Sequence, residues 1–183
     1  MSISKLFTYV DIMNWEIIRD EILPIIPESL LTGSSSSVSY PPEVFEACRK
    51  NSVLMTEFRR LGLIDFWHST GIVVVKPNGA LPIHTDTGRH IWSLNIPMLN
   101  CSGSSTVFYE VNAEPVFTPP KNGTTAYNKF PSENCIEIDR FTLDRPALLR
   151  VNLPHNVVNL TVAPRIALAF RLSSEFNIAS GNF

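Results

Sequence analysis

The residues best suited to chemistry lie in one short run near the middle of the chain, Leu81-Pro82-Ile83-His84-Thr85-Asp86. This run is predicted to be a β-strand, and side chains at positions i and i+2 of a strand point to the same face. His84 and Asp86 would then converge, and together they supply two of the three ligands of a 2-His-1-carboxylate iron site. Such a pair is common by chance, so the hypothesis depends on a second histidine.

His155 is the histidine that can complete this site. His68 precedes the β-rich half of the chain, and His90 is too close to His84 along the next predicted strand. His155 is distant in sequence and can be delivered by a neighbouring strand, as a facial triad requires. Taken alone, it is equally consistent with an ordinary turn histidine at the end of a strand.

The last predicted strand, Arg165–Leu172, has two chemically different faces. Alternation places four apolar residues on one face, namely Ile166, Leu168, Phe170 and Leu172. The other face carries Arg165, Ala167, Ala169 and Arg171. The alanines leave room beside the arginine for a ligand that matches its fork of donors, such as a carboxylate. The alternative is a solvent-exposed face, which alanine rarely occupies in strands.

The elements that must position these residues are mostly β-strands. From Leu63 to Leu172, short apolar runs alternate with turn residues, which indicates a sandwich or barrel, and a jelly roll is the commonest closure for eight strands. The predicted strands are Gly71–Lys76, Leu81–Asp86, His90–Met98, Ser105–Val111, Cys135–Phe141, Ala147–Val151, His155–Leu160 and Arg165–Leu172.

The N-terminal part is predicted to be helical support for this core. In chain order we expect a strand over Lys5–Ile12, a helix capped by Asn14 and stopped by Pro24 and Pro27, a flexible loop over Thr32–Ser37, and a helical region from Pro41 to about Leu61. We interpret residues 1–183 as one domain, with helical support at 1–62, a jelly-roll core at 63–172 and a tail at 173–183. A proline-rich insertion at 114–134 is either disordered or a functional lid.

Composition and charge argue against several classes of protein. The net charge is −2 and the basic residues are scattered, so neither nucleic acid nor a membrane is an expected partner. No run approaches the ~18 apolar residues of a membrane span, and the N-terminus does not resemble a signal peptide. The three cysteines form no CxxC pair and are expected to be free thiols in a reducing cytoplasm.

Several of these motifs together resemble the iron(II)- and 2-oxoglutarate-dependent dioxygenases. They are Ala80–Asp86, the Asn-Ile-Pro-Met run that ends the next strand, Leu-Pro-His155, and Arg165 at the start of the last strand. Lys76–Ala80 and Asn95–Asn100 are most similar to the aspartyl/asparaginyl β-hydroxylase and proline hydroxylase branch. The resemblance covers about Gly71 to Leu172 and does not include the N-terminal seventy residues.

The resemblance implies a double-stranded β-helix enzyme of cupin-like, jelly-roll fold. His84, Asp86 and His155 would bind Fe(II), and Arg165 would bind the 5-carboxylate of the cosubstrate 2-oxoglutarate. With O2, such an enzyme hydroxylates a C–H bond of an amino acid, a protein side chain or a small metabolite, and releases succinate and CO2. Some β-hydroxylases of that branch replace the acidic ligand, whereas this chain keeps Asp86.

Substrate and cosubstrate contacts are expected from residues near the site. Arg89 and Arg171 are candidates to bind a small-molecule or peptidyl substrate. Ser93, Asn95 and Tyr109 lie on strands that could reach the cosubstrate, although ordinary strand packing also explains them.

Two other classes of function remain open. One is a cupin-type metalloprotein that works without 2-oxoglutarate, either a dioxygenase or an isomerase. Cupins more often use three histidines and a glutamate, which this chain does not provide at the usual spacing. The other is a non-enzymatic jelly-roll binding module. Arg165 discriminates between these readings, because only the 2-oxoglutarate enzyme needs its guanidinium as a ligand.

Overall fold

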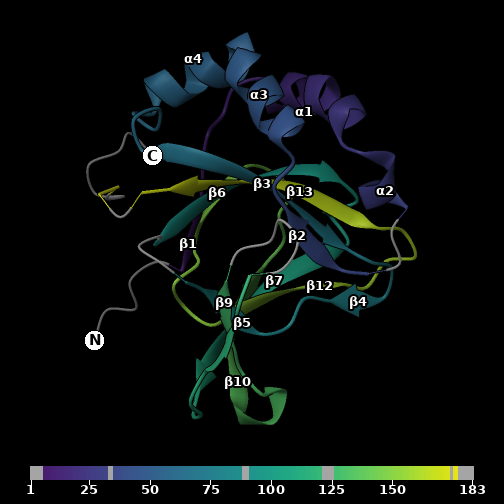
Figure 1. Ribbon diagram of the computed structural model, residues 1–183, viewed down its shortest axis with the longest axis vertical. Coiled ribbons are helices and arrows are strands. Elements are labelled where there is room, and N and C mark those ends of the chain that lie inside the picture. Colours follow the sequence, from purple (N-terminus) through teal and green to yellow (C-terminus); the bar gives the residue numbers. More distant parts are fainter. Residues whose placement is uncertain (1–5, 33–34, 88–90, 121–125, 174, 177–183) are drawn as a thin grey trace.

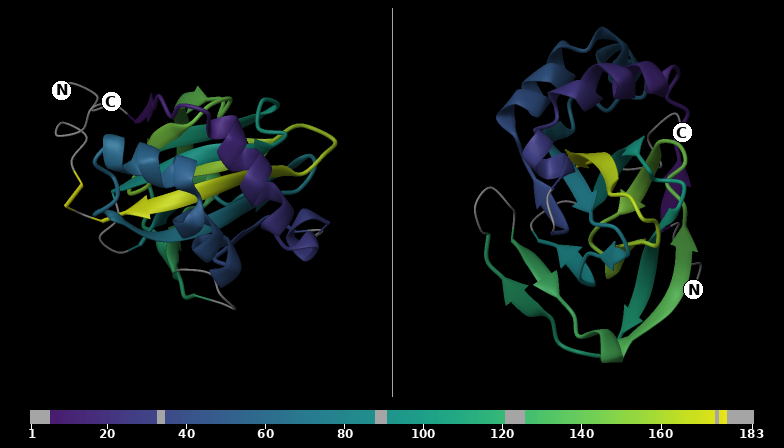
Figure 2. Two further views of the ribbon diagram at one scale, coloured as in Figure 1. Left: turned by 90° about the horizontal axis from the view of Figure 1, so that it is seen from above. Right: turned by 90° about the vertical axis from the view of Figure 1, so that its right-hand side faces the viewer.

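The computed structural model describes residues 6–32, 35–87, 91–120, 126–173 and 175–176. Within these ranges the chain is mainly β, and its strands form two antiparallel sheets that face each other (Figure 1). This is the predicted jelly-roll, or double-stranded β-helix, fold. The helices lie together on one side, and Figure 2 shows them covering the outer face of one sheet.

The sheet beneath the helices has six strands. Their order is β1 (Phe7–Tyr9), β11 (Ala147–Arg150), β6 (Trp92–Leu99), β13 (Arg165–Leu172), β3 (Trp67–Val75) and β2 (Ser37–Ser39). β13 therefore runs through the interior of this sheet, between β6 and β3. β2 forms one edge.

The facing sheet has seven strands. Its main order is β10 (Cys135–Phe141), β7 (Ser104–Val111), β12 (His155–Asn159), β5 (His84–Asp86), β9 (Tyr127–Lys129) and β8 (Val116–Thr118). The short strand β4 (Gly79–Ala80) pairs with β12 beside this path. β10 and β8 are the two edges, and both reach away from the helices (Figure 1).

The helical layer is made of short elements. They are α1 (Trp15–Ile22), η1 (Leu23–Ile25), α2 (Glu28–Leu31), α3 (Pro42–Lys50) and α4 (Ser52–Arg60), and a further turn, η2 (Ser132–Asn134), precedes β10. Among the described helices, none has the length and apolar character needed to cross a membrane.

The two faces of β13 join the helical layer to the interior of the barrel. The apolar face predicted from the sequence packs in the main core under the helices, and the ring of Phe170 lies 5.1 Å from that of Phe58 in α4. The opposite face, with Arg165, Ala169 and Arg171, points between the sheets and lines a cavity there. The prediction that the side chains of this strand alternate between an apolar face and a face that carries the arginines is confirmed.

The helices lie where the sequence predicted them, but the number of helices after Pro41 and the cap at Asn14 differ from the prediction. The region after Pro41 is two helices, because Asn51 has extended backbone angles and its side chain caps the second helix by accepting from Leu54 N at 2.8 Å. Asn14 precedes α1 as predicted, but it lies in the left-handed region at φ 56° and its side chain makes no cap hydrogen bond.

Two segments predicted as irregular contain regular structure beside the site. The loop expected over Thr32–Ser37 ends in β2, and the Ser36 hydroxyl accepts from Lys76 N at 3.2 Å. The insertion at 114–134 contributes β8 and β9, which extend the sheet from β5. Neither segment carries a strong period-two pattern, and pairing with a neighbouring strand is what orders them.

A buried asparagine ties the end of β12 to the beginning of β13. Asn159 is fully buried, and its Nδ2 donates to the carbonyl oxygens of Val75, Lys76 and Ala163 at 3.1, 3.1 and 2.8 Å. Its Oδ1 accepts from the Thr161 backbone N and hydroxyl. These bonds fix the turn that delivers Arg165 to the cavity.

Asn159→Ala should lower the free energy of unfolding by about 2–4 kcal/mol, because several buried backbone groups lose their partner at once. Urea denaturation of the purified variant measures this loss. Asn152→Ala, at an exposed turn position, is the matched control and should change stability by less than about 0.5 kcal/mol. Equal losses in the two variants would contradict the role assigned to Asn159.

Candidate active site

His84 and His155 lie side by side on adjacent strands. They are register partners in the β5–β12 pair, and their ring centroids are 4.5 Å apart. Both side chains are buried. The structure therefore brings together the two histidines that the sequence analysis selected, although they are far apart along the chain.

Backbone carbonyls fix the orientation of both rings. Nδ1 of His84 is 2.8 Å from the oxygen of Pro82, and Nδ1 of His155 is 2.8 Å from the oxygen of Leu153. A carbonyl oxygen can only accept, so each Nδ1 must carry the proton and donate it. In the neutral tautomer with this Nδ1 proton, Nε2 has a lone pair for a metal ion, the arrangement in which metal-binding histidines are commonly held.

Burial keeps His155 neutral. Loss of solvent lowers the pKa of His155 to about 4, and the nearby His84 acts in the same direction, while Asp86 opposes them. At neutral pH the imidazole is therefore uncharged. A histidine must be in this form to bind a metal ion.

Asp86 shares the face of His84 and is held by an arginine. Its Oδ1 is 3.7 Å from Nε2 of His84, and its Oδ2 accepts from Nη2 of Arg171 at 2.8 Å. Both side chains of this ion pair are nearly buried, and the Arg171 guanidinium also lies over the ring of Tyr40. Arg171, expected to be a substrate ligand, is thus in the site wall with its charge balanced by Asp86.

His84, His155 and Asp86 lie close together, but their side chains are not arranged as a complete set of metal ligands. Among the residues that the structure describes, no three His, Cys, Asp or Glu side chains are arranged to hold a metal ion as they stand. The Asp86–Arg171 bond occupies Oδ2 of the carboxylate, whereas Oδ1 faces His84 at 3.7 Å from its Nε2. Two imidazole nitrogens and one carboxylate oxygen nevertheless form the donor set suited to Fe(II).

The same side chains line a small cavity between the sheets, with a volume of about 50 Å³. Its polar lining is His84, Asp86, Ser93, Asn95, Thr106, His155, Arg165 and Arg171, together with Tyr40. Ser93 and Asn95 thus face the space in which a cosubstrate would lie, where Ser93 Oγ donates to Asn95 Oδ1 at 3.0 Å. Tyr109 does not line this cavity and instead donates to Asn156 at 3.2 Å.

Arg165 is a buried cation without a carboxylate partner among the described residues. Its side chain is only 1% exposed, and its Nε and Nη1 make no hydrogen bond. Burial lowers the pKa of Arg165, and contact with the Cys101 thiol opposes this effect. A buried charge that is only partly satisfied costs free energy, so the two nitrogen atoms without a hydrogen bond favour a bound anion at this position.

Thr106 adds a second unsatisfied group to the same cavity. The threonine is 2% exposed, and its hydroxyl Oγ1 has no hydrogen-bond partner. It lies on β7 opposite Val157 of β12, which turns it toward the interior. The sequence analysis missed Thr106, because a threonine inside an ordinary strand pattern carries no signal until the strands are paired.

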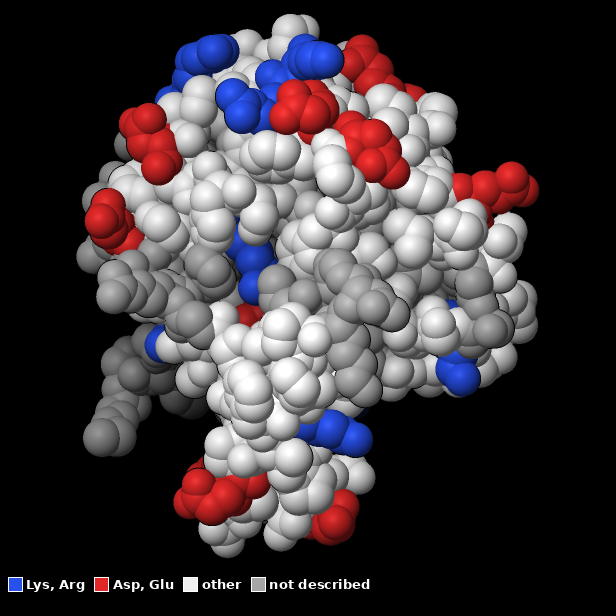
Figure 3. Space-filling model, in the orientation of Figure 1, with Lys and Arg blue, Asp and Glu red and all other residues white. Residues whose placement is uncertain are grey.

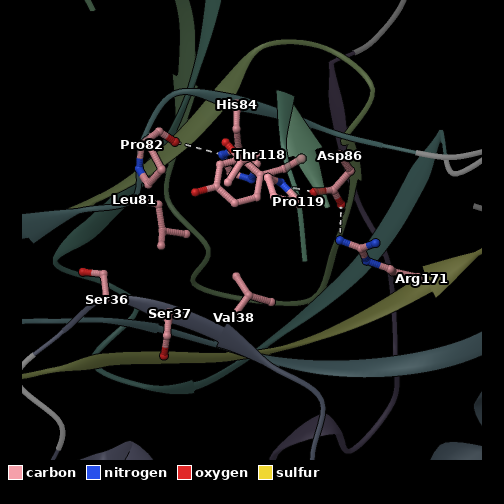
Figure 4. Close-up of a pocket in the computed structure, with 11 residues that line it drawn as sticks. Ser36, Ser37, Val38, Leu81, Pro82, His84, Asp86, Thr118, Pro119 and Arg171 are labelled. Atoms are coloured by element: carbon pink, nitrogen blue, oxygen red, sulfur yellow. Dashed lines mark hydrogen bonds and ion pairs between the residues drawn. The ribbon is translucent and has the colours of Figure 1, made fainter. Parts of the chain in front are cut away.

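A larger pocket of about 270 Å³ leads from this centre to the surface (Figure 4). His84, Asp86 and Arg171 line both the cavity and this pocket. The remaining lining residues are Ser36, Ser37, Val38, Leu81, Pro82, Thr118, Pro119 and Tyr127. In Figure 3 a hollow on this side of the molecule has basic and acidic atoms at its floor.

Part of this pocket comes from a segment that the sequence analysis did not assign to the site, and part comes from the insertion at 114–134, which it expected to be disordered or a functional lid that holds the substrate. Ser36, Ser37 and Val38 belong to the N-terminal part, which lies outside the region that resembles the dioxygenases. Thr118 and Tyr127 come from the insertion. Arg89, predicted to bind substrate, lies outside the described residues.

Comparison with known proteins identifies no family. No family model matches the sequence, and no curated protein matches it significantly. A prolyl-4-hydroxylase from Pseudomonas putida is 10% identical, with 94% of this chain and 95% of that chain covered and a TM-score of 0.47. The viral collagen prolyl hydroxylase of Paramecium bursaria Chlorella virus-1, solved with 2OG, is 12% identical over 92% and 96%, with a TM-score of 0.46.

A cupin domain from Bordetella pertussis is also similar. It is 14% identical, with 57% of this chain and 80% of that chain covered and a TM-score of 0.34. Likeness at this level concerns the arrangement of strands, and the chemistry of the site has to be argued from its own residues.

The Asp86–Arg171 pair can be tested by a double-mutant cycle in metal-free protein. Asp86→Ala leaves a buried guanidinium unpaired and should lower the free energy of unfolding by about 3 kcal/mol. Adding Arg171→Met removes that charge, so the double variant should lose at least 1 kcal/mol less than the sum of the single losses. Urea denaturation of the four proteins gives the coupling energy.

The exposed pair Glu137–Arg140 is the control for this cycle and should show a much smaller coupling, because water screens it. Simple additivity at Asp86 and Arg171 would contradict a buried, mutually dependent pair.

Proposed function

We propose that this protein is an Fe(II)- and 2-oxoglutarate-dependent dioxygenase that hydroxylates a C–H bond and releases succinate and CO2. The observation that carries the proposal is a single cavity lined both by the His84, Asp86 and His155 donors and by the unpaired Arg165 guanidinium. A metal site alone would suit many proteins. A metal site that shares its cavity with a buried cation lacking an anion suits a cosubstrate that is itself an anion.

The donor set fits ferrous iron. Nε2 of His84, Nε2 of His155 and a carboxylate oxygen of Asp86 would hold it on one side, leaving other positions for the cosubstrate and O2. Bound there, the metal supplies the activation of O2 and the oxidising power for attack on a C–H bond. The protein prepares this site in two ways. His155 is neutral at neutral pH, and the backbone hydrogen bonds at Nδ1 of both histidines leave Nε2 as the nitrogen that can bind the metal ion.

Arg165 and Thr106 fit one end of a dicarboxylate. The guanidinium offers two unused N–H groups and the threonine offers one hydroxyl, which together match the oxygens of a carboxylate. The described lining of the cavity sets the carboxylate of Asp86 against the guanidinium groups of Arg165 and Arg171, so it is positive even before a metal ion adds its charge. A dianion such as 2-oxoglutarate is the complementary partner.

The cavity must widen when such a ligand binds. Its volume is about 50 Å³, against about 270 Å³ for the outer pocket. The outer pocket shares His84, Asp86 and Arg171 with it, so movement of these side chains would join the two spaces. Release of Asp86 from Arg171 toward the metal is the simplest such movement.

The closed barrel then protects the reaction from water. Val73, Leu81, Leu149 and Val157 form much of the apolar lining of the cavity, and a dry site strengthens the attraction between its charges.

The cytoplasm is the location we propose, since the three cysteines are free thiols and two of them are buried.

The alternatives are a cupin-type metalloprotein without 2-oxoglutarate and a non-enzymatic binding module. Both share the fold, and a cupin also shares the donor set. Neither requires the two nitrogen atoms of Arg165 that lack a hydrogen bond in the cavity of the metal-binding candidates, and this difference supports the 2-oxoglutarate enzyme.

Arg165→Met should separate cosubstrate binding from metal binding. Methionine keeps an apolar stem of similar length but offers no donor, so 2-oxoglutarate affinity should fall at least 100-fold, or about 2.7 kcal/mol. Metal affinity should change less than threefold. Calorimetry with Mn(II) as a redox-inert substitute, before and after addition of 2-oxoglutarate, measures both.

Two further variants complete this test. His155→Ala should show the opposite pattern, with metal affinity lost at least tenfold. Arg59→Met, at an exposed helix end, should alter neither affinity. Arg165→Met should also be as stable as the unsubstituted protein or more so, because an unpaired buried charge has been removed. Unchanged 2-oxoglutarate binding by folded Arg165→Met would overturn the proposal.

A further inference from the structure

The described lining of the outer pocket offers no unbalanced charge to a substrate. Asp86 and Arg171 are the charged residues among those described in its lining, and they pair with each other at 2.8 Å. The other lining side chains are aliphatic, hydroxyl-bearing or aromatic, with proline at two positions. A free amino acid brings an ammonium and a carboxylate and would find a partner for neither without breaking the pair.

The pocket also lies between the free edges of the two sheets. β2 ends the six-stranded sheet and β8 ends the seven-stranded sheet, so among the described residues neither has a strand on its outer side. Both contribute to the pocket, through Ser37 and Val38 of β2 and Thr118 of β8. Figure 4 shows the residues of β2 lying across the pocket from His84, Thr118 and Pro119.

An edge strand directs part of its backbone N–H and C=O groups away from its sheet. These groups recognise extended polypeptide, which can add to the edge as another strand. Here two such edges flank one opening that leads to the metal-binding candidates. A chain placed between them would meet backbone partners and, through alternation of its side chains, direct one of them inward.

Exposed apolar side chains extend this surface along β8. Val116 and Phe117 are 62% and 61% exposed, next to Thr118 at the pocket. Large apolar groups in such a position favour contact with a partner over contact with water. The opposite edge of the same sheet, β10, also exposes Ile136 and Ile138, but neither lines the pocket.

We propose that the substrate is an extended polypeptide that lies between β2 and β8 and directs one uncharged, mainly apolar side chain toward His84 and Asp86. This inference rests on the proposed function for its chemistry, while the binding surface is argued independently of it. It selects a peptidyl substrate over the free amino acids and small metabolites that the sequence left open.

Binding of capped peptides tests the inference without turnover. Nine-residue peptides, acetylated and amidated at their ends and carrying a central Pro, Leu, Asp or Lys, are titrated into protein loaded with Mn(II) and 2-oxoglutarate and into untreated protein. We expect the central Pro or Leu peptides to bind at least tenfold more tightly than the central Asp or Lys peptides. Methylation of alternate backbone amides in the best peptide should weaken its binding at least tenfold.

Free proline and free leucine are titrated in parallel and should bind far more weakly than the capped peptides. Binding of either free amino acid as tightly as the corresponding peptide would overturn the inference in favour of a small-molecule substrate. Preference for charged central residues, or indifference to amide methylation, would overturn it equally.

Single substitutions locate the bound peptide. Ser37→Glu on β2 and Thr118→Glu on β8 place a charge in the pocket wall and should each weaken peptide binding at least tenfold. Ile138→Glu adds the same charge on β10, at the remote edge, and is the matched control that should bind as the unsubstituted protein does. Circular dichroism confirms that each variant is folded. Weakening by Ile138→Glu alone would place the peptide on the wrong edge and overturn the inference.

The two proposals fail in different ways. If 2-oxoglutarate binds through Arg165 but no peptide binds at β2 and β8, this inference fails and the proposed reaction stands. If peptides bind at β2 and β8 but 2-oxoglutarate does not bind, the reaction fails and the peptide surface stands.

Discussion

A positive charge buried inside the barrel, for which the described residues offer no carboxylate, is the constraint on which the candidate site depends. Arg165 is almost completely buried, and two of its nitrogen atoms have no hydrogen-bond partner. A chain selected for stability alone would place an apolar side chain there or supply a carboxylate. An anion bound in the cavity that Arg165 shares with Thr106 and the two histidines would offset the cost of these unsatisfied donors.

The fold explains how such an arrangement is maintained. β13 uses one face to pack under the helices and the other to present Arg165 and Arg171 to the interior, so the main core fixes the position of the site's cations. Asn159 fixes the turn before Arg165, and the pairing of β5 with β12 fixes the two imidazoles. The sequence-distant parts of the site are therefore held by the same contacts that stabilise the barrel.

Sequence patterns were sufficient for the fold class, for most strands, and for the meeting of His84 with His155. They worked because period-two alternation is strong in β13 and because histidines are few. They failed for β2, β8 and β9, which are short and show little alternation of apolar and polar residues. Pairing with neighbouring strands makes these segments regular, and they contribute to the wall of the pocket. Thr106 was invisible for a related reason, since its unsatisfied hydroxyl is a property of the assembled cavity.

The ion pair between Asp86 and Arg171 could not be read from the sequence either. The sequence analysis expected Arg171 to bind substrate. In the structure its guanidinium pairs with Asp86, the candidate metal-binding carboxylate. This pairing also leaves the described lining of the outer pocket without a free charge, which is the basis for inferring an uncharged side chain as the group that enters it.

The central claim is that one cavity binds a ferrous ion and 2-oxoglutarate together. The most direct measurement is the visible absorption spectrum under anaerobic conditions, recorded after addition of Fe(II) and again after 2-oxoglutarate. The account requires a charge-transfer band that develops only when both are present, because the keto acid must chelate the protein-bound metal. Folded, iron-loaded protein that shows no such band at saturating 2-oxoglutarate would contradict it.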